Sequence, residues 1–236
     1  DPPRWLALAK DEVRYVGQPV VAILAESAEN ALTASELVEV DYEELASVGT
    51  IQDAEKESAP AIWKGAPGNL LIQMEHGDAA KTDRIFAEAD HVTELVLSNS
   101  RLVGNAMEPR ASVCRRDPEQ DRLILHAGHQ APTGLQESLC KDIFGWSTDK
   151  LRIVVGHLGG GFGIRAETYP EEIVTVYAAH KQSRPVKWNG DRTQEFYGTV
   201  HGRDQLSTAS LACSKDGKIQ ASVSYTHLRA HETRGN

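Results

Sequence analysis

A glycine-rich loop at residues 159–163 carries the strongest indication of a binding site in this sequence. It reads GGGFG, follows the apolar, β-branched stretch 151–155 and precedes a helix start. Glycine loses much conformational entropy on folding, so a run of glycines usually marks a place where another group approaches the backbone closely. Phe162 places a large ring inside this run. We therefore expect the loop to wrap a bulky cofactor, with Phe162 as part of the wall.

The spacing of this loop does not match the two common phosphate-binding motifs. No Lys-Ser or Lys-Thr follows it, as a P-loop requires, and Ile164 stands where the dinucleotide motif G-x-G-x-x-G has its last glycine. The loop nevertheless joins an expected strand to an expected helix, where backbone N–H groups can point at a ligand. A tight, crowded turn would explain the same glycines equally well.

Gln130 is a second candidate, because it lies in the stretch HAGHQAP between an expected strand and an expected helix. Its amide offers two donors and an acceptor, which suit either the oxo ligand of a metal or the cap of a turn. Taken alone, Gln130 is better explained as a turn cap. His126 and His129 look like a metal pair, but side chains three apart on a strand point to opposite faces, so we expect structural roles for both.

Charged residues near these candidates do not identify a reaction by themselves. Glu108, in the stretch MEPR, is either a buried acid or the salt-bridge partner of Arg110, and the salt bridge is the favoured interpretation. The stretches 184–195 and 201–204 are typical of an ion-paired sheet edge.

The elements that must position these residues predict a mixed α/β (α+β) fold. The expected helices are identified by capping residues and capping boxes. These helices are 28–37 after Ser27, 79–88 after Asp78, one from the Thr133/Gln136 box to a stop at Gly145, and one from the Thr168/Glu171 box to about 181.

The expected strands follow from β-branched stretches bounded by turn residues. Strand, glycine loop, helix and strand in succession predict a βαβ crossover, with 151–155 parallel to 184–188. The other strands are two within 13–25 around a turn at 17–19, then 38–42, 91–98, 110–116 and 122–128, and a hairpin of 204–213 with 218–224.

Composition limits the function classes. The net charge of −9 over 236 residues argues against a general affinity for nucleic acid or an anionic membrane, and no apolar run is long enough to span a bilayer. Three cysteines without CxxC spacing indicate reduced, structural thiols in a cytoplasmic protein. The chain opens with DPPRW and no signal peptide, as if cut from something longer. Residues 47–68 read as a linker, and 225–236 as a disordered tail that looks non-native.

Together these pieces resemble one family: the large, molybdenum-binding subunits of xanthine dehydrogenases and aldehyde oxidases, and among them the aerobic carbon monoxide dehydrogenase type. The resemblance covers nearly the whole chain, from about residue 5 to 221, with the matching stretches in the same order as in the family. The stretches that carry it are VRYVGQPVVAILAES, VEVDYEEL, MEPR, HQAP, LGGGFG, YPEE, RPVKW followed by DR, and HGRD.

The resemblance implies a division of the chain and a cofactor. Residues 1–46 would be the C-terminal part of a small α/β hammerhead domain, and 69–224 the first half of a molybdopterin-binding domain. Gln130 would hydrogen-bond an oxo ligand of molybdenum, so that both it and Phe162 lie in the second shell of the metal. Gly160, Gly161, Phe162 and Gly163 would pack against the molybdenum-molybdopterin, expected in its cytosine dinucleotide form.

The implied reaction is hydroxylation with water as the oxygen source. Its electrons would leave through [2Fe-2S] clusters on a small subunit to FAD on a medium subunit, in a dimer of heterotrimers. The catalytic glutamate of the family would lie downstream, so no catalytic residue is assigned in this chain, which alone would be an inactive fragment.

Two departures bear on the substrate. Many members have lysine where this chain has Arg165, and purine-oxidising members have glutamate where it has Ala166. Xanthine is therefore a doubtful substrate, and carbon monoxide, an aldehyde or an N-heterocycle remain open. Two other hypotheses compete with the hydroxylase: a non-enzymatic module that binds a small anion or a partner, and a nucleotide-dependent enzyme. The missing G-K-[ST] motif counts against the last.

Overall fold

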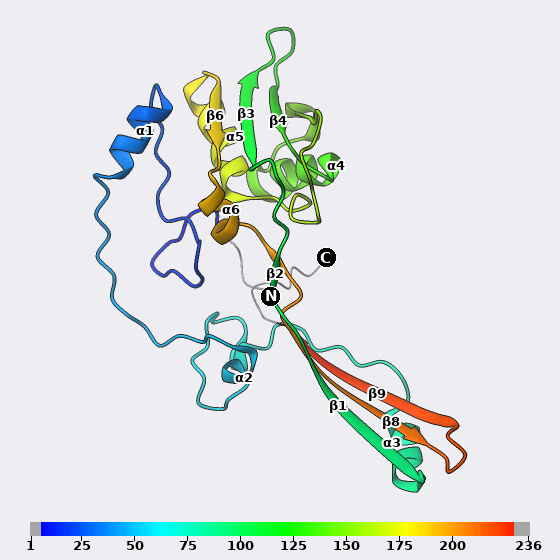
Figure 1. Ribbon diagram of the computed structural model, residues 1–236. Helices are drawn as coiled ribbons and strands as arrows, with labels where there is room; N and C mark the ends of the chain where they lie inside the picture. The colour runs from blue at the N-terminus through cyan, green and yellow to red at the C-terminus, as the bar shows by residue number, and fades with distance from the viewer. Residues whose placement is uncertain (1–5, 229–236) are drawn as a thin grey trace. The chain divides into compact units, whose positions relative to one another are not determined.

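The computed structural model describes residues 6–228, and within them the chain forms two compact units (Figure 1). The first unit comprises Glu44–Leu102 and residues 202–228. The second, which we call the site unit, comprises residues 6–43 and Val103–His201. The strands β2 (Leu102–Val103) and β7 (His201–Gly202) pair where the chain passes between the units.

A four-stranded sheet forms the centre of the site unit, in the order β5-β4-β3-β6. The strands β3 and β4 form an antiparallel hairpin, and β4 pairs with β5 in parallel. A parallel pair needs a crossover, which the helical segment between β4 and β5 provides. The strands are β3 (Ala111–Arg116), β4 (Leu123–Ala127), β5 (Leu151–Val154) and β6 (Val186–Asn189).

The predicted pairing of β5 with β6 is wrong, although the strands run in the same direction. The strand β6 instead pairs antiparallel with β3, so β5 and β6 are the opposite edges of the sheet. The sequence shows a strand–helix–strand succession, but it does not show that β4 and β3 would lie between β5 and β6 in the sheet.

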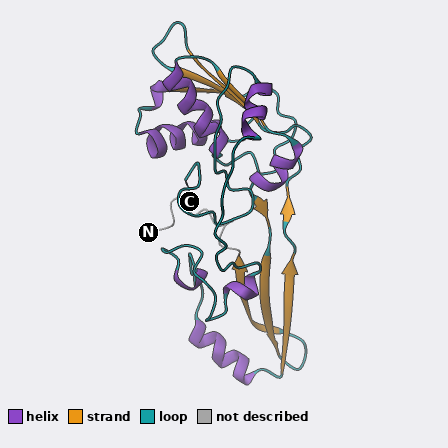
Figure 2. Ribbon diagram, turned by 90° about the vertical axis from the view of Figure 1, so that its left-hand side faces the viewer, coloured by secondary structure: helices purple, strands orange, loops and turns teal. Residues whose placement is uncertain are grey.

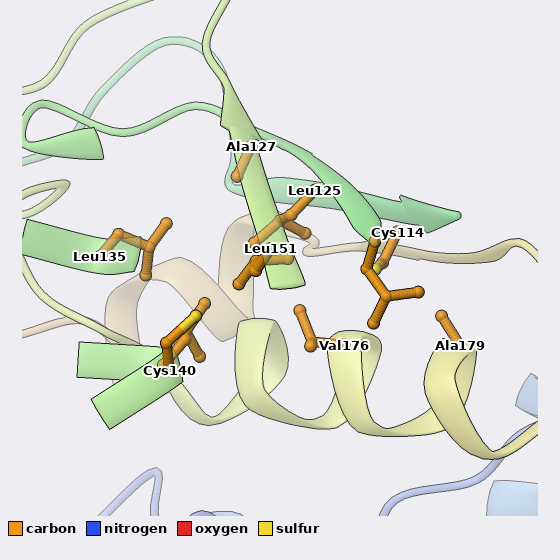
Figure 3. Packing of buried hydrophobic residues seen from close by; sticks show 10 residues of the cluster. Cys114, Leu125, Ala127, Leu135, Cys140, Leu151, Val176 and Ala179 are labelled. Atoms are coloured by element: carbon orange, nitrogen blue, oxygen red, sulfur yellow. The ribbon is translucent and has the colours of Figure 1, made fainter. Parts of the chain in front are cut away.

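The core lies between this sheet and its helices (Figure 2). Val176 and Ala179 of α5 (Pro170–Gln182) face Leu125, Leu151 and other apolar side chains (Figure 3). Burying an aliphatic side chain of this size contributes about 1.5–3 kcal/mol. The buried members of the cluster are Cys114, Leu123, Leu125, Ala127, Leu135, Leu139, Cys140, Leu151, Val176 and Ala179.

The helix after β4 starts two residues earlier than the Thr133/Gln136 box predicts. Pro132 occupies the first turn of α4 (Pro132–Glu137), and Ala131 precedes it without a side-chain cap. Gln136 donates instead to the carbonyl oxygens of Thr148 and Leu151, so that capping box is wrong. A π-helical segment, Ser138–Phe144, continues to the predicted stop at Gly145, whose φ is 66°. The 3₁₀ turn η3 (Thr148–Lys150) leads into β5.

The predicted Thr168/Glu171 box is displaced by one residue. Tyr169 precedes Pro170 at the start of α5, and the Glu172 carboxylate accepts a hydrogen bond from the Tyr169 N–H at 3.0 Å. Glu171 is thereby free to pair with Arg110. The last helix of the unit, α6 (Arg192–Gly198), has a capping box of its own, with Asp191 and Gln194.

The N-terminal part of the site unit contains one of the predicted elements. The helix α1 (Ala28–Ser35) starts at Ser27, whose Oγ accepts from the Asn30 N–H at 3.1 Å. The predicted turn before Pro19 is present, with a Gln18 N–H to Tyr15 carbonyl bond of 3.2 Å. The strands predicted within 13–25 and at 38–42 are wrong: both segments lack a ladder partner among the described residues, and a strand needs one.

The first unit contains an antiparallel sheet in the order β1-β8-β9 (Figure 1). The hairpin of β8 and β9 turns at Gly217, as predicted, and Asp78 caps α3, also as predicted. The prediction of disorder for 225–236 is wrong for residues 225–228, which pair with β8. Residues 229–236 lie outside the described part of the chain. The elements are α2 (Ile51–Ala54), η1 (Pro67–Asn69), α3 (Ala79–Glu88), β1 (His91–Asn99), β8 (Gln205–Cys213) and β9 (Ile219–Leu228).

The stretch predicted as a linker, 47–68, is partly ordered by one amide. The Asn69 side chain accepts from the Ile62 N–H at 3.0 Å and donates to the carbonyl oxygens of Pro60 and Ala54. Within residues 6–228, no helix has both the length and the apolar character that crossing a bilayer would require.

Candidate functional site

Gln130 and the glycine loop meet at one place in the site unit, although they come from different segments. The Gln130 Oε1 accepts from the N–H of Gly163 at 2.9 Å and from that of Arg165 at 3.3 Å. The Gln130 N–H donates in turn to the Arg165 carbonyl at 2.8 Å. A Cβ at Gly161 would lie 2.6 Å from the Gln130 Cδ, so the amide can lie against this backbone only because residue 161 has no side chain. The predicted convergence of Gln130 with the loop is confirmed.

These contacts fix the orientation of the Gln130 amide. Two backbone N–H groups converge on one oxygen, so that atom must be the carbonyl and the other must be the NH₂ group. The Gln130 side chain is exposed, and no residue within 6–228 accepts a hydrogen bond from its Nε2. The site therefore presents an oriented amide donor at the surface beside the loop.

The loop adds backbone donors to this amide. Among the described residues, none accepts from the N–H groups of Gly160, Gly161 and Phe162. Phe162 has a φ of 52°, in the left-handed region that a bulky residue rarely adopts, and its side chain is 74% exposed. Strain of this kind costs of order 1–3 kcal/mol and is concentrated at functional sites. An exposed ring on a strained backbone is consistent with the predicted wall of a ligand site.

Two glycines outside the loop also depend on close packing around the site. A Cβ at Gly104 would lie 2.7 Å from the Ile164 Cγ2 and 3.3 Å from the Phe162 Cβ. A Cβ at Gly128 would lie 2.5 Å from the Arg165 Nη1. Sequence motifs do not single out these two residues, which look like ordinary glycines until the structure is known.

The expected salt bridge between Glu108 and Arg110 is wrong. Glu108 pairs with Arg165, whose Nη1 lies 3.0 Å from the Glu108 Oε2 and whose Nη2 donates to the Glu108 carbonyl. The same carboxylate accepts from the Gly159 N–H at 2.7 Å. We expected Glu108 to pair with Arg110 because side chains two apart on an extended segment point to the same side. The actual partner, Arg165, comes from the distant glycine-loop region.

Arg110 is the centre of a second buried network. It contacts Glu195 at 3.0 Å and Glu171 at 3.0 Å, and its guanidinium lies 3.8 Å from the centroid of the Tyr169 ring. Burial alone would lower the pKa of Arg110, but attraction to Glu171 and the other partners raises it above its ordinary value. The Tyr169 hydroxyl donates to the Ile164 carbonyl, so this network reaches the glycine loop. The ion pairing predicted for 184–195 is present at Glu195.

His129 has the structural environment that we expected, whereas the role expected for His126 stays a prediction. His126 is exposed, whereas His129 is buried and accepts from the Ala131 N–H through Nδ1 at 3.0 Å. Its Nε2 therefore carries the proton and donates to the Glu167 carbonyl at 3.1 Å. Burial lowers the pKa of His129, which keeps the ring neutral. No cluster of three or more metal-ligating side chains occurs in the part of the chain that the structure describes.

Comparison with known proteins identifies the domains. Residues 62–229 match the molybdopterin cofactor-binding domain, and residues 3–46 match the a/b hammerhead domain of aldehyde oxidase and xanthine dehydrogenase. The chain is 32% identical, over 95% of its length, to the nicotine 6-hydroxylase large subunit of Paenarthrobacter nicotinovorans. It is 31% identical, over 91% of its length, to the carbon monoxide dehydrogenase large chain of Afipia carboxidovorans.

Solved structures give the same result. The CO dehydrogenase from Oligotropha carboxidovorans superimposes with a TM-score of 0.83 at 30% identity, over 93% of this chain and 29% of the other. The quinoline 2-oxidoreductase from Pseudomonas putida 86 gives 0.83 at 28% identity, over 93% and 28%. The chain spans 26% of the nicotine hydroxylase subunit and 28% of the carbon monoxide dehydrogenase chain, about a quarter of each. It belongs to the molybdopterin cofactor-binding family of aldehyde oxidase and xanthine dehydrogenase.

Proposed function

We propose that this chain is part of the large subunit of a molybdenum hydroxylase, and that Gln130 and the loop 159–163 contact its molybdenum-molybdopterin. The observation that supports this most directly is a set of donors without an acceptor among residues 6–228: the Gln130 Nε2 and the N–H groups of Gly160, Gly161 and Phe162. These groups all donate, so they suit an anionic, oxygen-rich ligand. The missing side chain at Gly161 lets the Gln130 amide lie against the loop, so that all these donors are in one place.

Each residue has a distinct part in the proposal. The Gln130 amide, fixed by two backbone donors, would donate to an oxygen beside the metal and stabilise negative charge there. Phe162 would pack against the cofactor and keep water away, while Gly160, Gly161 and Gly163 let the backbone approach it. The bound cofactor supplies the redox chemistry of hydroxylation with water as oxygen source. We assign no proton-transfer role to any residue of this chain.

The substrate and the partners extend the proposal. Relatives are named for carbon monoxide, nicotine and hypoxanthine, so we propose carbon monoxide, an aldehyde or an N-heterocycle as the substrate class. The names also describe subunits of complexes. We propose an FAD-binding medium subunit and a [2Fe-2S] small subunit in a dimer of heterotrimers, with the cofactor as the cytosine dinucleotide. Residues 1–46 would belong to the hammerhead domain, 47–68 to the connection and 69–224 to the cofactor domain.

The free thiols support a further part of the proposal. Cys114, Cys140 and Cys213 form no disulfide with one another, and two of them are buried. We propose a cytoplasmic location, where thiols stay reduced.

A non-enzymatic module that binds a small anion would use the same donors, so cofactor content decides between the two functions. The experiment uses the full-length protein, purified with its partners, and measures molybdenum and pterin dinucleotide per polypeptide. We expect molybdenum and the pterin dinucleotide to be present in near-stoichiometric amounts. A protein that carries neither, when expressed with cofactor supply, would support the anion-binding module.

The role of Gln130 is tested by Gln130→Ala, with Gln120→Ala as a matched control. Gln120 lies in the exposed β3–β4 turn, and its side chain makes no hydrogen bond within residues 6–228. Removing one oriented donor to a developing negative charge typically lowers turnover by about 10²–10³-fold. We expect this loss in molybdenum-loaded Gln130→Ala and none in Gln120→Ala. Wild-type turnover in metal-loaded Gln130→Ala would show that the assigned role is wrong.

A further inference from the structure

We infer that Glu108 and Arg165 are positioning residues that hold the glycine loop in its ligand-binding shape. The inference deepens the proposed function and rests on it. Neither side chain would touch the reacting atoms. Their effect would be transmitted through the backbone of residues 159–165. This segment carries Phe162 and the N–H donors that have no acceptor among the described residues.

One carboxylate connects the two ends of the loop. The Glu108 Oε2 accepts from the Gly159 N–H at 2.7 Å, at the start of the loop, and from the Arg165 Nη1 at 3.0 Å, at its end. The Glu108 backbone strengthens this link, because its N–H donates to the Gly159 carbonyl at 3.2 Å and its own carbonyl accepts from the Arg165 Nη2. A single residue therefore fixes both ends of the segment that presents the donors.

Of the two residues that hold the loop, Arg165 is buried in the interior and Glu108 lies nearer the surface. The Arg165 side chain is 1% exposed, whereas that of Glu108 is 46% exposed. A buried guanidinium is costly unless it is paired, so its position is strongly determined by the Glu108 carboxylate. Gly128 provides the space, since a Cβ there would lie 2.5 Å from the Arg165 Nη1.

The segment that carries Glu108 is itself held from α6. Arg192 donates from Nη1 to the Ala106 carbonyl at 2.7 Å and from Nη2 to the Met107 carbonyl at 2.7 Å. The connection therefore runs from α6 through the residues before Glu108 to the loop. The loop's shape is set by these long-range contacts, and not by its own glycine-rich sequence, which alone would sample many conformations.

The geometry explains why lysine would be a poor substitute. The guanidinium uses two nitrogens at once, one on the Glu108 carboxylate and one on the Glu108 carbonyl. An ammonium group is a single point charge and cannot reproduce this planar, two-point contact. Arg165→Lys keeps the charge but loses one contact, and Glu108→Gln keeps an acceptor for the Gly159 N–H but loses the ion pair.

The first test measures hydrogen–deuterium exchange in the full-length protein prepared without cofactor. Peptides that cover 158–166 report the loop directly, so this readout does not depend on activity. We expect both variants to exchange about tenfold faster in this segment, the effect of losing one charge-assisted hydrogen bond. The matched control is Arg184→Lys, in an exposed pair with Glu26, which should leave the segment unchanged. Unchanged exchange in both the Glu108 and the Arg165 variant would overturn the inference, whatever the protein's function.

The second test measures how much molybdenum and pterin the full-length protein keeps after gel filtration. Changing a residue that orients a cofactor's contacts typically weakens binding about 10–100-fold, so we expect about tenfold less retention in Arg165→Lys than in Arg184→Lys. Equal retention in the two variants would overturn the inference and leave the proposed function standing. Wild-type protein without molybdenum would overturn the proposed function instead, and with it the positioning role.

Discussion

A methyl group added at Gly161 is the sharpest perturbation that the structure offers. In Gly161→Ala the new Cβ would lie 2.6 Å from the Gln130 Cδ and 2.7 Å from its Oε1, well inside van der Waals contact. The backbone at 161 has no positive φ, so alanine adds no local strain. The substitution therefore acts by displacing the Gln130 side chain.

The magnitude follows from the bonds that this displacement breaks. Gln130 loses two hydrogen bonds, from the Gly163 and Arg165 N–H groups, each worth about 0.5–1.5 kcal/mol net. The displaced amide is exposed and can bond to water, which keeps the cost low. We expect the unfolding free energy to fall by about 1–2 kcal/mol. The oriented donor is lost as well, so turnover should fall by about 10²–10³-fold, as expected for Gln130→Ala.

The assay compares Gly161→Ala with Gly156→Ala in the full-length protein. Gly156 lies just before the loop, and a Cβ there meets nothing within 4 Å. Urea unfolding, molybdenum content and turnover are measured on each. The control should match the wild type or gain up to about 1 kcal/mol, since alanine restricts the unfolded chain. If Gly161→Ala behaved like Gly156→Ala in all three measurements, the contact between Gln130 and the loop would be refuted.

Three further predictions follow from buried groups. Arg110→Met leaves the Glu195 carboxylate, 5% exposed, without its cation, and should lower the unfolding free energy by about 3–5 kcal/mol in urea titrations; a loss under 1 kcal/mol would contradict it. Burial raises the pKa of Cys114 to about 12, so its thiol should react slowly with a thiol-specific reagent. Labelling of the native protein at pH 8, followed by mass spectrometry, should therefore modify the less buried Cys213 well before Cys114, and equal labelling would contradict this. Burial lowers the pKa of His129 below 6.5, so its contribution to stability is present above pH 6.5 and is lost as the pH falls; His129→Gln should reduce this acid sensitivity in urea midpoints between pH 5 and 7.5.

Local signals in the sequence predicted local structure well. The caps at Ser27 and Asp78, the stop at Gly145 and the turn at Gly217 all follow from backbone and side-chain chemistry within a few residues. The two capping boxes failed because a nearby proline fixed the helix start elsewhere, two residues before the predicted N-cap at α4 and one residue after it at α5.

Long-range pairing could not be predicted from such signals. Nothing near residue 108 indicates that Glu108 would pair with Arg165, 57 positions away, and not with Arg110. The segment 13–25 has strand composition, but composition cannot show whether a partner strand is available. Gln130 and the loop were brought together by the family resemblance, while their hydrogen bonds, and the supporting Gly104 and Gly128, came from the structure.

We propose that Gln130 and the loop 159–163 form one side of a molybdopterin site. Anomalous diffraction at the molybdenum edge, from crystals of the full-length protein, locates the metal independently of activity. We expect a single strong peak beside the Gln130 Nε2 and the Phe162 ring. A molybdenum peak on another surface, away from both residues, would contradict it.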